Sequence, residues 1–178
     1  MSPGWRIPHL TDVFLSCCET NLGVSQLSDE PLTLATGFLC AGARSVVSTL
    51  WAVDDLATAI FSIIYYRLRK DGLDRPIALQ QAQHELKHIS GEESEDHYPE
   101  LHEYIDIQFK QANNNRKEAK ARLKQLLKGT PEYERVEAEA SQWNQIATKF
   151  SRSKKRLKEF QPFAHPYYWA GFVSQGLR

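Results

Sequence analysis

Residues 38–55 read FLCAGARSVVSTLWAVDD, and this stretch decides the fold. Its segment Arg44–Val53 is rich in β-branched and aromatic residues and follows Gly42, which predicts a buried strand. The segment that leads into it, Pro31–Ala41, predicts a helix, because its apolar residues share one face at helical spacing. These residues are Leu32, Ala35, Phe38 and Leu39. The stretch therefore predicts a helix followed by a central strand.

Two further apolar segments complete the predicted sheet. Asp12–Cys18 (DVFLSCC) is short and bounded by polar residues, which predicts a buried strand before the helix. The resulting strand–helix–strand unit is expected to be parallel and right-handed, as such units almost always are. Tyr167–Val173, which follows Pro166, predicts a third strand. We therefore predict an α/β fold with a mostly parallel sheet of about three strands flanked by helices.

Two amphipathic helices are predicted after the central strand. The first is Asp55–Lys70, ended by Gly72, and the second begins at Asp74, with Pro76 in its first turn. Their buried stripes are expected to be Leu56, Ile60, Ile63, Ile64 and Leu68 in the first, and Ala78, Leu79, Ala82, Leu86 and Ile89 in the second.

The composition changes after about Ser90, where Lys, Glu, Gln, Arg and Ala become dominant. Gly129, Thr130 and Pro131 mark the end of one helix and the start of another. We predict an antiparallel helical hairpin over residues 92–160, inserted between residues 1–91 and a final strand within 161–178. The basic run Ser151–Lys158 has no interleaved aromatic residues, so a solvated helix face is favoured over a nucleic-acid site.

The bulk composition excludes several classes of protein. Lys and Arg together number 22, as do Asp and Glu, so the global charge indicates no nucleic-acid partner. No apolar segment approaches the roughly 20 residues of a membrane span. Three cysteines without a secretory leader predict free thiols and a cytoplasmic location. No cofactor is indicated, and no carboxylate spacing suggests a metal site at the histidines, which include His84, His88, His97 and His102.

A cysteine doublet lies at the end of the first predicted strand, in residues 14–23, FLSCCETNLG. Either one thiol is a nucleophile or both are small core residues. Successive side chains of an extended segment face opposite sides, and ligands bind beyond the carboxyl ends of open α/β sheets. Cys18 is closer to that position, where backbone amides can lower a thiol pKa and allow attack on a peptide carbonyl. Cys17 and Cys40 are then expected in the core.

Four blocks together resemble one family, the CHAT domain, in its C-terminal part. The blocks are LSCCET (residues 15–20), residues 38–55, IALQQAQ (residues 77–83) and HPYYWAGFV (residues 165–173). The resemblance implies a partial caspase-like fold and a cysteine endopeptidase related to separase and the caspases. It implies Cys18 as the nucleophile, because the family motif Ser-Ala-Cys-Glu-Thr puts its alanine on Cys17. Such domains are often found behind tetratricopeptide repeats, and the implied substrate is a protein or peptide.

The general base that this chemistry needs is not evident in the sequence. The family takes its histidine from an upstream His-Gly motif, which does not occur before Cys18. His9 lies nine extended residues away, roughly 30 Å, and His165 is expected to have a packing and turn role. We therefore expect the chain alone to be inactive. It would need a missing N-terminal half, or a tetratricopeptide-repeat region, in cis or in trans.

An exposed edge is expected on the first strand, which predicts self-association or pairing with a partner. Trp51, Asp54 and Asp55 follow the second strand, where caspase-like enzymes build the pocket for the residue before the scissile bond. An acid there would select Lys or Arg, although one of the two aspartates is expected to cap the following helix. Two functions remain open: the nucleophile-bearing part of a cysteine endopeptidase, or a catalytically inactive CHAT fragment that acts as a protein-interaction module.

Overall fold

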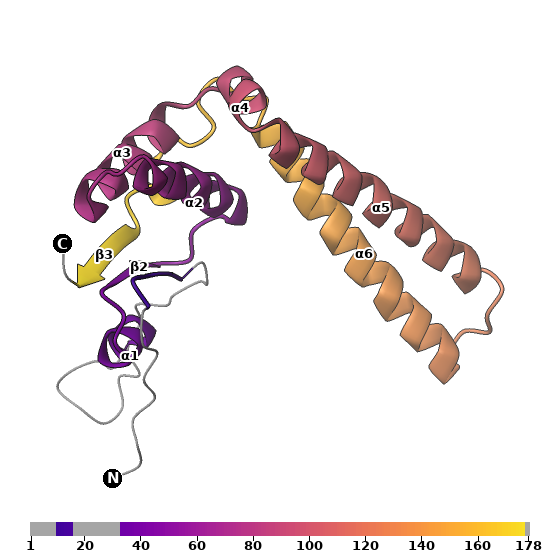
Figure 1. The fold of residues 1–178 in the computed structure, drawn as a ribbon. Coiled ribbons are helices and arrows are strands. Elements are labelled where there is room, and N and C mark those ends of the chain that lie inside the picture. The colour runs from indigo at the N-terminus through magenta and orange to yellow at the C-terminus, as the bar shows by residue number, and fades with distance from the viewer. Residues whose placement is uncertain (1–9, 16–32, 177–178) are drawn as a thin grey trace, which may run out of the picture. The chain divides into compact units, whose positions relative to one another are not determined.

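The structure is a computed structural model that describes residues 10–15 and 33–176. Its contacts divide the chain into two compact units (Figure 1). Residues 1–89 and 163–178 form the first unit, and residues 90–162 form the second. The first unit holds the sheet, and the second consists of helices.

A sheet of three strands forms the centre of the first unit (Figure 1). The strands are β1 (Asp12–Phe14), β2 (Ser45–Thr49) and β3 (Phe172–Gly176), in the order β1-β2-β3. β1 is parallel to β2, and β3 is antiparallel to β2. Every residue of β2 is buried, as expected for a central strand. The predicted α/β class is confirmed, although the described sheet is mixed rather than mostly parallel.

Helices cover both faces of the sheet because strand side chains alternate between the faces. On one face Val13 and Val46 pack with the helix α1 (Leu34–Cys40), whose Ala35 is fully buried. On the other face Phe14 meets aromatic residues of α2 (Asp55–Lys70). The two faces are therefore separate apolar layers: an aliphatic layer against α1 and an aromatic layer against α2.

The helices α2 and α3 (Arg75–His88) follow the sequence prediction closely. The predicted bounds of α2 are confirmed, and Gly72 lies between the helices with a φ of 91°. In α3 the residues Ala78, Ala82 and Leu86 are buried. Ile63 was wrongly predicted to be buried, since its exposed fraction is 42%. The buried face of α2 instead includes Ala57, Phe61, Ile64 and Tyr65.

Strand boundaries are the least accurate part of the prediction. β3 begins at Phe172 rather than at Tyr167, because Pro166–Tyr168 forms a short 3-10 helix, η1. The side chain of His165 caps η1 by accepting a hydrogen bond from the backbone N–H of Tyr167, which confirms its turn role. β2 is also shorter than predicted and ends at Thr49, because the chain then turns toward α2.

Cys40 is exposed, which corrects the expectation that it belongs to the core. It lies five residues after Ala35, which is about 140° around a helix with 3.6 residues per turn. Because Ala35 marks the buried side of α1, this rotation carries the thiol away from the sheet.

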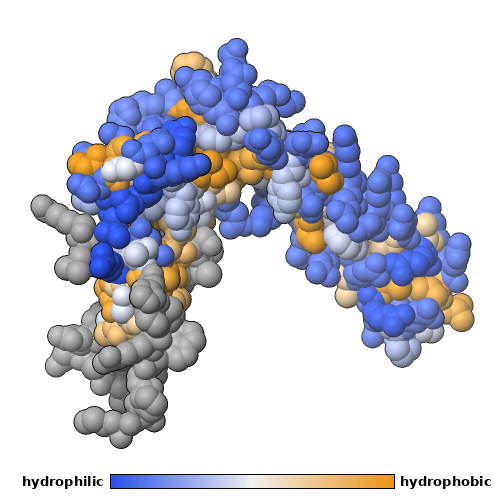
Figure 2. Space-filling view, viewed as in Figure 1, coloured by the Kyte–Doolittle hydropathy of each residue, from blue (hydrophilic) through white to orange (hydrophobic). Residues whose placement is uncertain are grey.

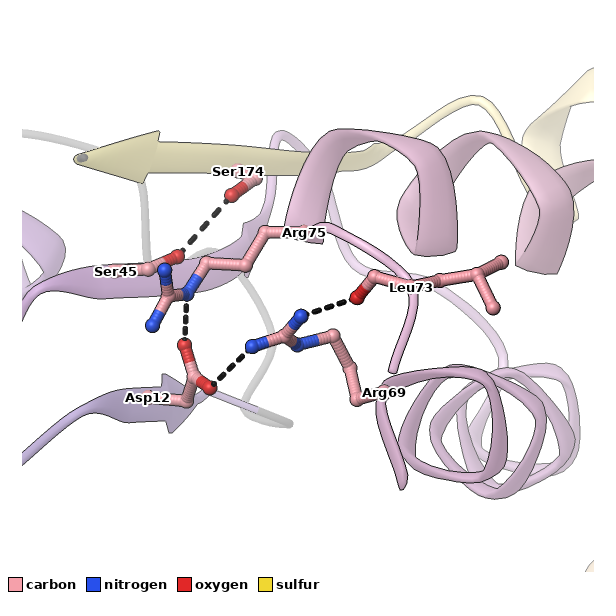
Figure 3. Close-up of polar contacts among 6 residues, drawn as sticks. All are labelled: Asp12, Ser45, Arg69, Leu73, Arg75 and Ser174. Atoms are coloured by element: carbon pink, nitrogen blue, oxygen red, sulfur yellow. Dashed lines mark hydrogen bonds and ion pairs between the residues drawn. The ribbon is translucent and has the colours of Figure 1, made fainter. Parts of the chain in front are cut away.

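An ion-pair cluster joins the amino end of β1 to Arg69 of the helix 55–70 and Arg75 of the helix 75–88 (Figure 3). The carboxylate of Asp12 accepts hydrogen bonds from Arg69 at 3.3 Å and from Arg75. Burial raises the pKa of the Tyr65 phenol, and the nearby Asp12 carboxylate raises it further. This cluster lies at the amino end of β1, whereas α/β sheets bind ligands at the carboxyl ends of their strands, so its role is to stabilise the sheet.

The second unit contains three helices, α4 (Gly91–His97), α5 (Pro99–Leu123) and α6 (Pro131–Arg156). α5 and α6 pack side by side as the predicted antiparallel hairpin (Figure 1). Gly129 ends the connection with a φ of 82°, and the Thr130 hydroxyl caps α6 by accepting from the backbone N–H of Tyr133. The predicted hairpin and its turn are confirmed.

Small side chains and complementary charges fix the pairing of α5 with α6. The buried alanines along the contact are Ala112, Ala119, Ala140 and Ala147. Ion pairs join Asp106 to Lys154 at 2.8 Å and Arg122 to Glu139. Leu157 is buried, so the basic run at the end of α6 is a solvated helix face with one residue turned inward, as predicted.

The surface of the hairpin is mostly hydrophilic, with apolar patches near the end where α5 and α6 are joined (Figure 2). Leu127 in that connection is 80% exposed. Within residues 10–15 and 33–176, no helix is both long and apolar enough to cross a membrane.

Candidate functional site

The candidate site begins where β1 ends. Leu15 follows β1 and still donates its backbone N–H to the carbonyl of Val47, at 2.8 Å. It is almost fully buried and packs in the aliphatic layer. Cys17 and Cys18 follow it directly in the sequence, and both lie outside the described residues. The structure therefore describes the strand that leads to the predicted nucleophile and the neighbouring loop, but not the thiol itself.

The neighbouring loop follows β2 and carries Trp51, which is held by the segment before β3. The indole Nε1 of Trp51 donates to the carbonyl of Tyr167 at 3.0 Å, and the Tyr167 hydroxyl donates to the carbonyl of Ala52. The backbone N–H of Leu50 donates to the carbonyl of Gly171 at 2.9 Å. Residues far apart in the chain thus fix the loop at the carboxyl end of the central strand.

Gly171 is required by the same packing. A Cβ atom added at Gly171 would lie 2.8 Å from Cε2 of Trp51, closer than side chains approach one another. The half-buried indole therefore lies flat against the backbone of the segment before β3. The indole fills the space between the loop after β2 and the segment before β3. This packing role does not depend on any contact with substrate.

The two aspartates after Trp51 have different surroundings. The Asp54 carboxylate caps α2 by accepting from the backbone N–H groups of Leu56 and Ala57, at 3.1 and 3.3 Å. Asp55 is the first residue of α2 and is exposed. The structure thus identifies Asp54 as the cap.

Gln83 is a positioning residue that the sequence analysis missed. From α3 its side-chain amide donates to the carbonyls of Trp169 and Phe172, at 3.1 and 3.0 Å. These carbonyls flank Gly171, so Gln83 holds the segment that packs on Trp51. Gln83 is the last residue of the block IALQQAQ that suggested the family, but nothing in that block assigned it a role, because glutamine is common in helices.

The described residues were also compared with the requirements of a metal site. In the part of the chain that the structure describes, no three His, Cys, Asp or Glu side chains are arranged to hold a metal ion. A cavity of about 530 Å³ lies instead in the helical unit, where it is lined by charged residues that include Asp106 and Lys154. Its acidic residues Glu95, Glu103 and Asp106 are matched by Lys110, Lys154 and Lys158, and the cavity is not part of the predicted site.

A comparison with known families identifies the chain. The family model for the CHAT domain matches residues 5–177. This chain belongs to the CHAT domain family. The match includes the hairpin as well as the four blocks that suggested the family, and the mixed α/β sheet agrees with it. No curated protein and no solved structure matches the chain.

The CHAT domain family is a caspase-like peptidase family, and the chain is one of its members. Of the predicted site residues, the structure describes Trp51, Asp54 and Asp55, which lie together at the end of β2 and the start of α2. The predicted nucleophile Cys18 lies outside the described residues. Tyr167 and Gly171 contact the predicted site through Trp51, and no periodic pattern of the sequence predicts that contact.

Proposed function

We propose that this chain is the nucleophile-bearing part of a CHAT-type cysteine endopeptidase and that Cys18 is the nucleophile. The observation that carries the proposal is the path of β1, which is parallel to the central strand and is still hydrogen-bonded to it at Leu15. Cys18 is three residues further along the sequence, and α/β sheets bind their ligands beyond the carboxyl ends of their strands.

The reaction is peptide-bond hydrolysis through a thioester. The Cys18 thiolate attacks the scissile carbonyl carbon, the C–S bond forms, and the C–N bond breaks as the leaving amine takes a proton from a histidinium. Water then attacks the thioester, and the thiol is released with the new carboxylate. The 178 residues contain no His-Gly dipeptide. We infer that the catalytic histidine comes from another segment, in cis or in trans.

We expect that segment to join the sheet along the outer edge of β1. In the described sheet, β1 is hydrogen-bonded to β2 on one side and lies at the edge on the other. Edge strands are templates for pairing with another strand. Further strands from a missing N-terminal half, or from a tetratricopeptide-repeat protein, would extend the sheet there and bring the histidine; pairing of two copies of this chain is the alternative.

Asp55 is proposed to select a basic residue before the scissile bond. It is exposed at the start of α2, whereas Asp54 is committed to the helix cap. In the assembly whose cleavage activity a histidine-bearing segment restores, Asp55→Asn is expected to lower kcat/KM for peptides with Lys or Arg at that position at least tenfold, because a carboxylate pairs with both. Peptides with a neutral residue should be cleaved equally by both proteins.

Asp54→Asn is the matched control for Asp55, because asparagine caps helices about as well as aspartate. It removes one negative charge from the same loop and should leave the preference for Lys and Arg unchanged. Equal cleavage of basic, acidic and neutral peptides by the unmutated assembly would reject the acidic pocket.

Alkylation tests the nucleophile without requiring the histidine. We expect iodoacetamide to modify Cys18 much faster than Cys40 at neutral pH, because backbone amides at the end of a strand favour the thiolate. Cys40 is exposed and provides the internal reference for a reachable thiol. Mass spectrometry of the modified peptides gives the two rates from one reaction. Cys17→Ala, which restores the family residue, should leave the Cys18 rate unchanged.

An alkylation rate at Cys18 equal to that at Cys40 would instead support the second function, a catalytically inactive interaction module. The helical unit provides the observation in its favour, because large apolar side chains are exposed there: Tyr104, Ile107, Leu127 and Phe160. The chain alone is expected to show negligible peptidase activity. Robust cleavage that is lost in Cys18→Ala would contradict the need for a separate histidine.

A further inference from the structure

Two histidines on α3 have no part in the proposed peptidase site. Residues 84–88 read HELKH, and the first and last of them, His84 and His88, are both exposed. Their rings lie one helical turn apart, with centroids at 4.2 Å and planes inclined by 41°. No carboxylate spacing in the sequence suggests a metal there. The structure brings two imidazole rings together, and imidazole nitrogens bind metal ions without a carboxylate.

The hydrogen bond of His88 determines which ring nitrogen is available for another ligand. Its Nδ1 lies 2.8 Å from the backbone carbonyl oxygen of His84. A carbonyl oxygen can only accept, so Nδ1 carries the proton and Nε2 keeps its lone pair in the neutral ring. Metal-binding histidines are typically oriented in this way, by donating their other ring N–H to a carbonyl.

We propose that His84 and His88 form a two-imidazole site for a divalent transition-metal ion, with Zn²⁺ and Ni²⁺ as representative ligands. Imidazole nitrogens bind both ions. Two nitrogens at about 2.0–2.1 Å from a tetrahedral Zn²⁺ lie about 3.3 Å apart. The centroids of two rings that point at one such ion lie about 5 Å apart, so the rings, whose centroids are now at 4.2 Å, would separate slightly to bind it. A helical spacing of four residues provides the same arrangement in known zinc sites.

The surroundings leave room for the rest of the coordination sphere. A cavity of about 380 Å³ adjoins His84 and is lined by it together with Gln80, Gln81 and Glu85. Water molecules can occupy the remaining coordination positions in it, and the amide oxygens of the glutamines provide further neutral donors. The site takes a hydrated cation held by two protein ligands, unlike a closed structural site with four ligands.

The site is distinct from that of a zinc peptidase, although HELKH matches the His-Glu-x-x-His spacing of such enzymes. In those enzymes the glutamate acts as the general base. Here the Glu85 carboxylate forms an ion pair with Arg67 of α2, and within residues 10–15 and 33–176 no third metal ligand joins the two histidines. The proposed role is therefore binding of the cation, with no second hydrolytic activity.

Binding of the cation would stabilise the helix that holds the peptidase site. Gln83, the residue before His84, holds the carbonyls that flank Gly171. An ion that bridges one turn of α3 binds only the folded helix, so mass action raises the stability of the folded state. The first unit is thus expected to unfold at a higher temperature when Zn²⁺ or Ni²⁺ is present.

Calorimetric titration with Ni²⁺ and Zn²⁺ tests the proposal on the 178-residue chain without a histidine tag. Cys17, Cys18 and Cys40 are replaced by serine so that thiols do not bind the ions. We expect one saturable site, an affinity lowered at least tenfold in His84→Gln and in His88→Gln, and an increase in the unfolding temperature that both variants lose. His97→Gln is the matched control, because it removes an exposed histidine of α4.

Three results would overturn the proposal. They are the absence of a saturable site in the unmutated background, an unchanged affinity in either His84→Gln or His88→Gln, and a loss in His97→Gln as large as theirs. Circular dichroism of each variant without metal shows whether it is folded. Glutamine is a good helix former, so the α3 variants are expected to keep the spectrum of the parent, and a failed fold would be visible separately from a failed site.

Discussion

Replacement of Phe61 by alanine is expected to lower the free energy of unfolding of the sheet-containing unit by about 3–5 kcal/mol. Phe61 is fully buried, and its ring stacks on Phe172 of β3, with centroids 3.7 Å apart. It also meets Phe14 of β1. The substitution thus removes the contacts of this side chain with both edge strands and leaves a cavity in the aromatic layer.

Urea denaturation followed by tryptophan fluorescence measures this loss. A Trp143→Phe background removes the indole of the helical unit, so that the signal comes from the unit that contains Trp51 and Trp169. Tyr66→Ala is the matched control, because Tyr66 is an aromatic residue of the same helix with an exposed fraction of 48%. We expect it to cost about 1 kcal/mol or less. Equal costs for Phe61→Ala and Tyr66→Ala would contradict the aromatic layer as described.

Gly176→Ala is expected to have the second largest effect, a loss of about 3 kcal/mol, which combines backbone strain with overpacking. Gly176 has a φ of 111°, a conformation that side chains other than glycine rarely adopt. An added Cβ would also lie 2.3 Å from the carbonyl oxygen of Arg44. Because Gly176 pairs with Ser45, relief of the clash requires the end of β3 to move away from β2.

Gly72→Ala separates the two contributions to that loss. Gly72 also has a positive φ, 91°, but an added Cβ there would meet nothing within 4 Å. It should therefore show the conformational cost alone, about 1–2 kcal/mol. The same fluorescence assay measures both variants. A loss in Gly72→Ala as large as that in Gly176→Ala would show that the contact with Arg44 is not tight.

Local patterns were sufficient to predict most of the helices. The bounds of α2 follow from Asp54 as the cap and from Gly72 after its end, and both signals act within one or two helical turns. The strand ends were less predictable. Tyr167–Val173 is apolar enough for a strand, but His165 and Pro166 favour a 3-10 turn first. Similarly, the helical spacing on α1 did not reveal that Cys40 is exposed.

The hairpin was predictable because the signals that define its two helices are local in the sequence. Thr130 and Pro131 begin α6, and alanines at helical spacing mark the contact. The charges also agree with an antiparallel arrangement. The acidic start of α5 meets the basic end of α6 through Asp106 and Lys154, and the reverse holds at the other end through Arg122 and Glu139. A parallel pairing would have brought like charges together.

The residues of the candidate site were likewise predictable only in part. The residue types of the loop after β2 and the family blocks identified Trp51, Asp54 and Asp55 as candidates. Which aspartate caps the helix depended on the backbone geometry at the start of α2. The contact of Trp51 with Tyr167 joins residues that are 116 positions apart, and the contact between the rings of His84 and His88 became apparent from the ring distance.

The sequence by itself determined the helices, the strand–helix–strand unit, the hairpin and the family, because these depend on periodicity, capping and motifs over short separations. The local geometry of α2 and α3 decided that Asp54 caps its helix and that the rings of His84 and His88 are in contact. Only the tertiary structure decided that Gln83 holds the segment before β3 and that Tyr167 holds the loop that carries Trp51. The physical reason is that side-chain contacts between distant segments depend on how the sheet and its helices pack. That packing is a property of the whole unit, which no short stretch of sequence contains.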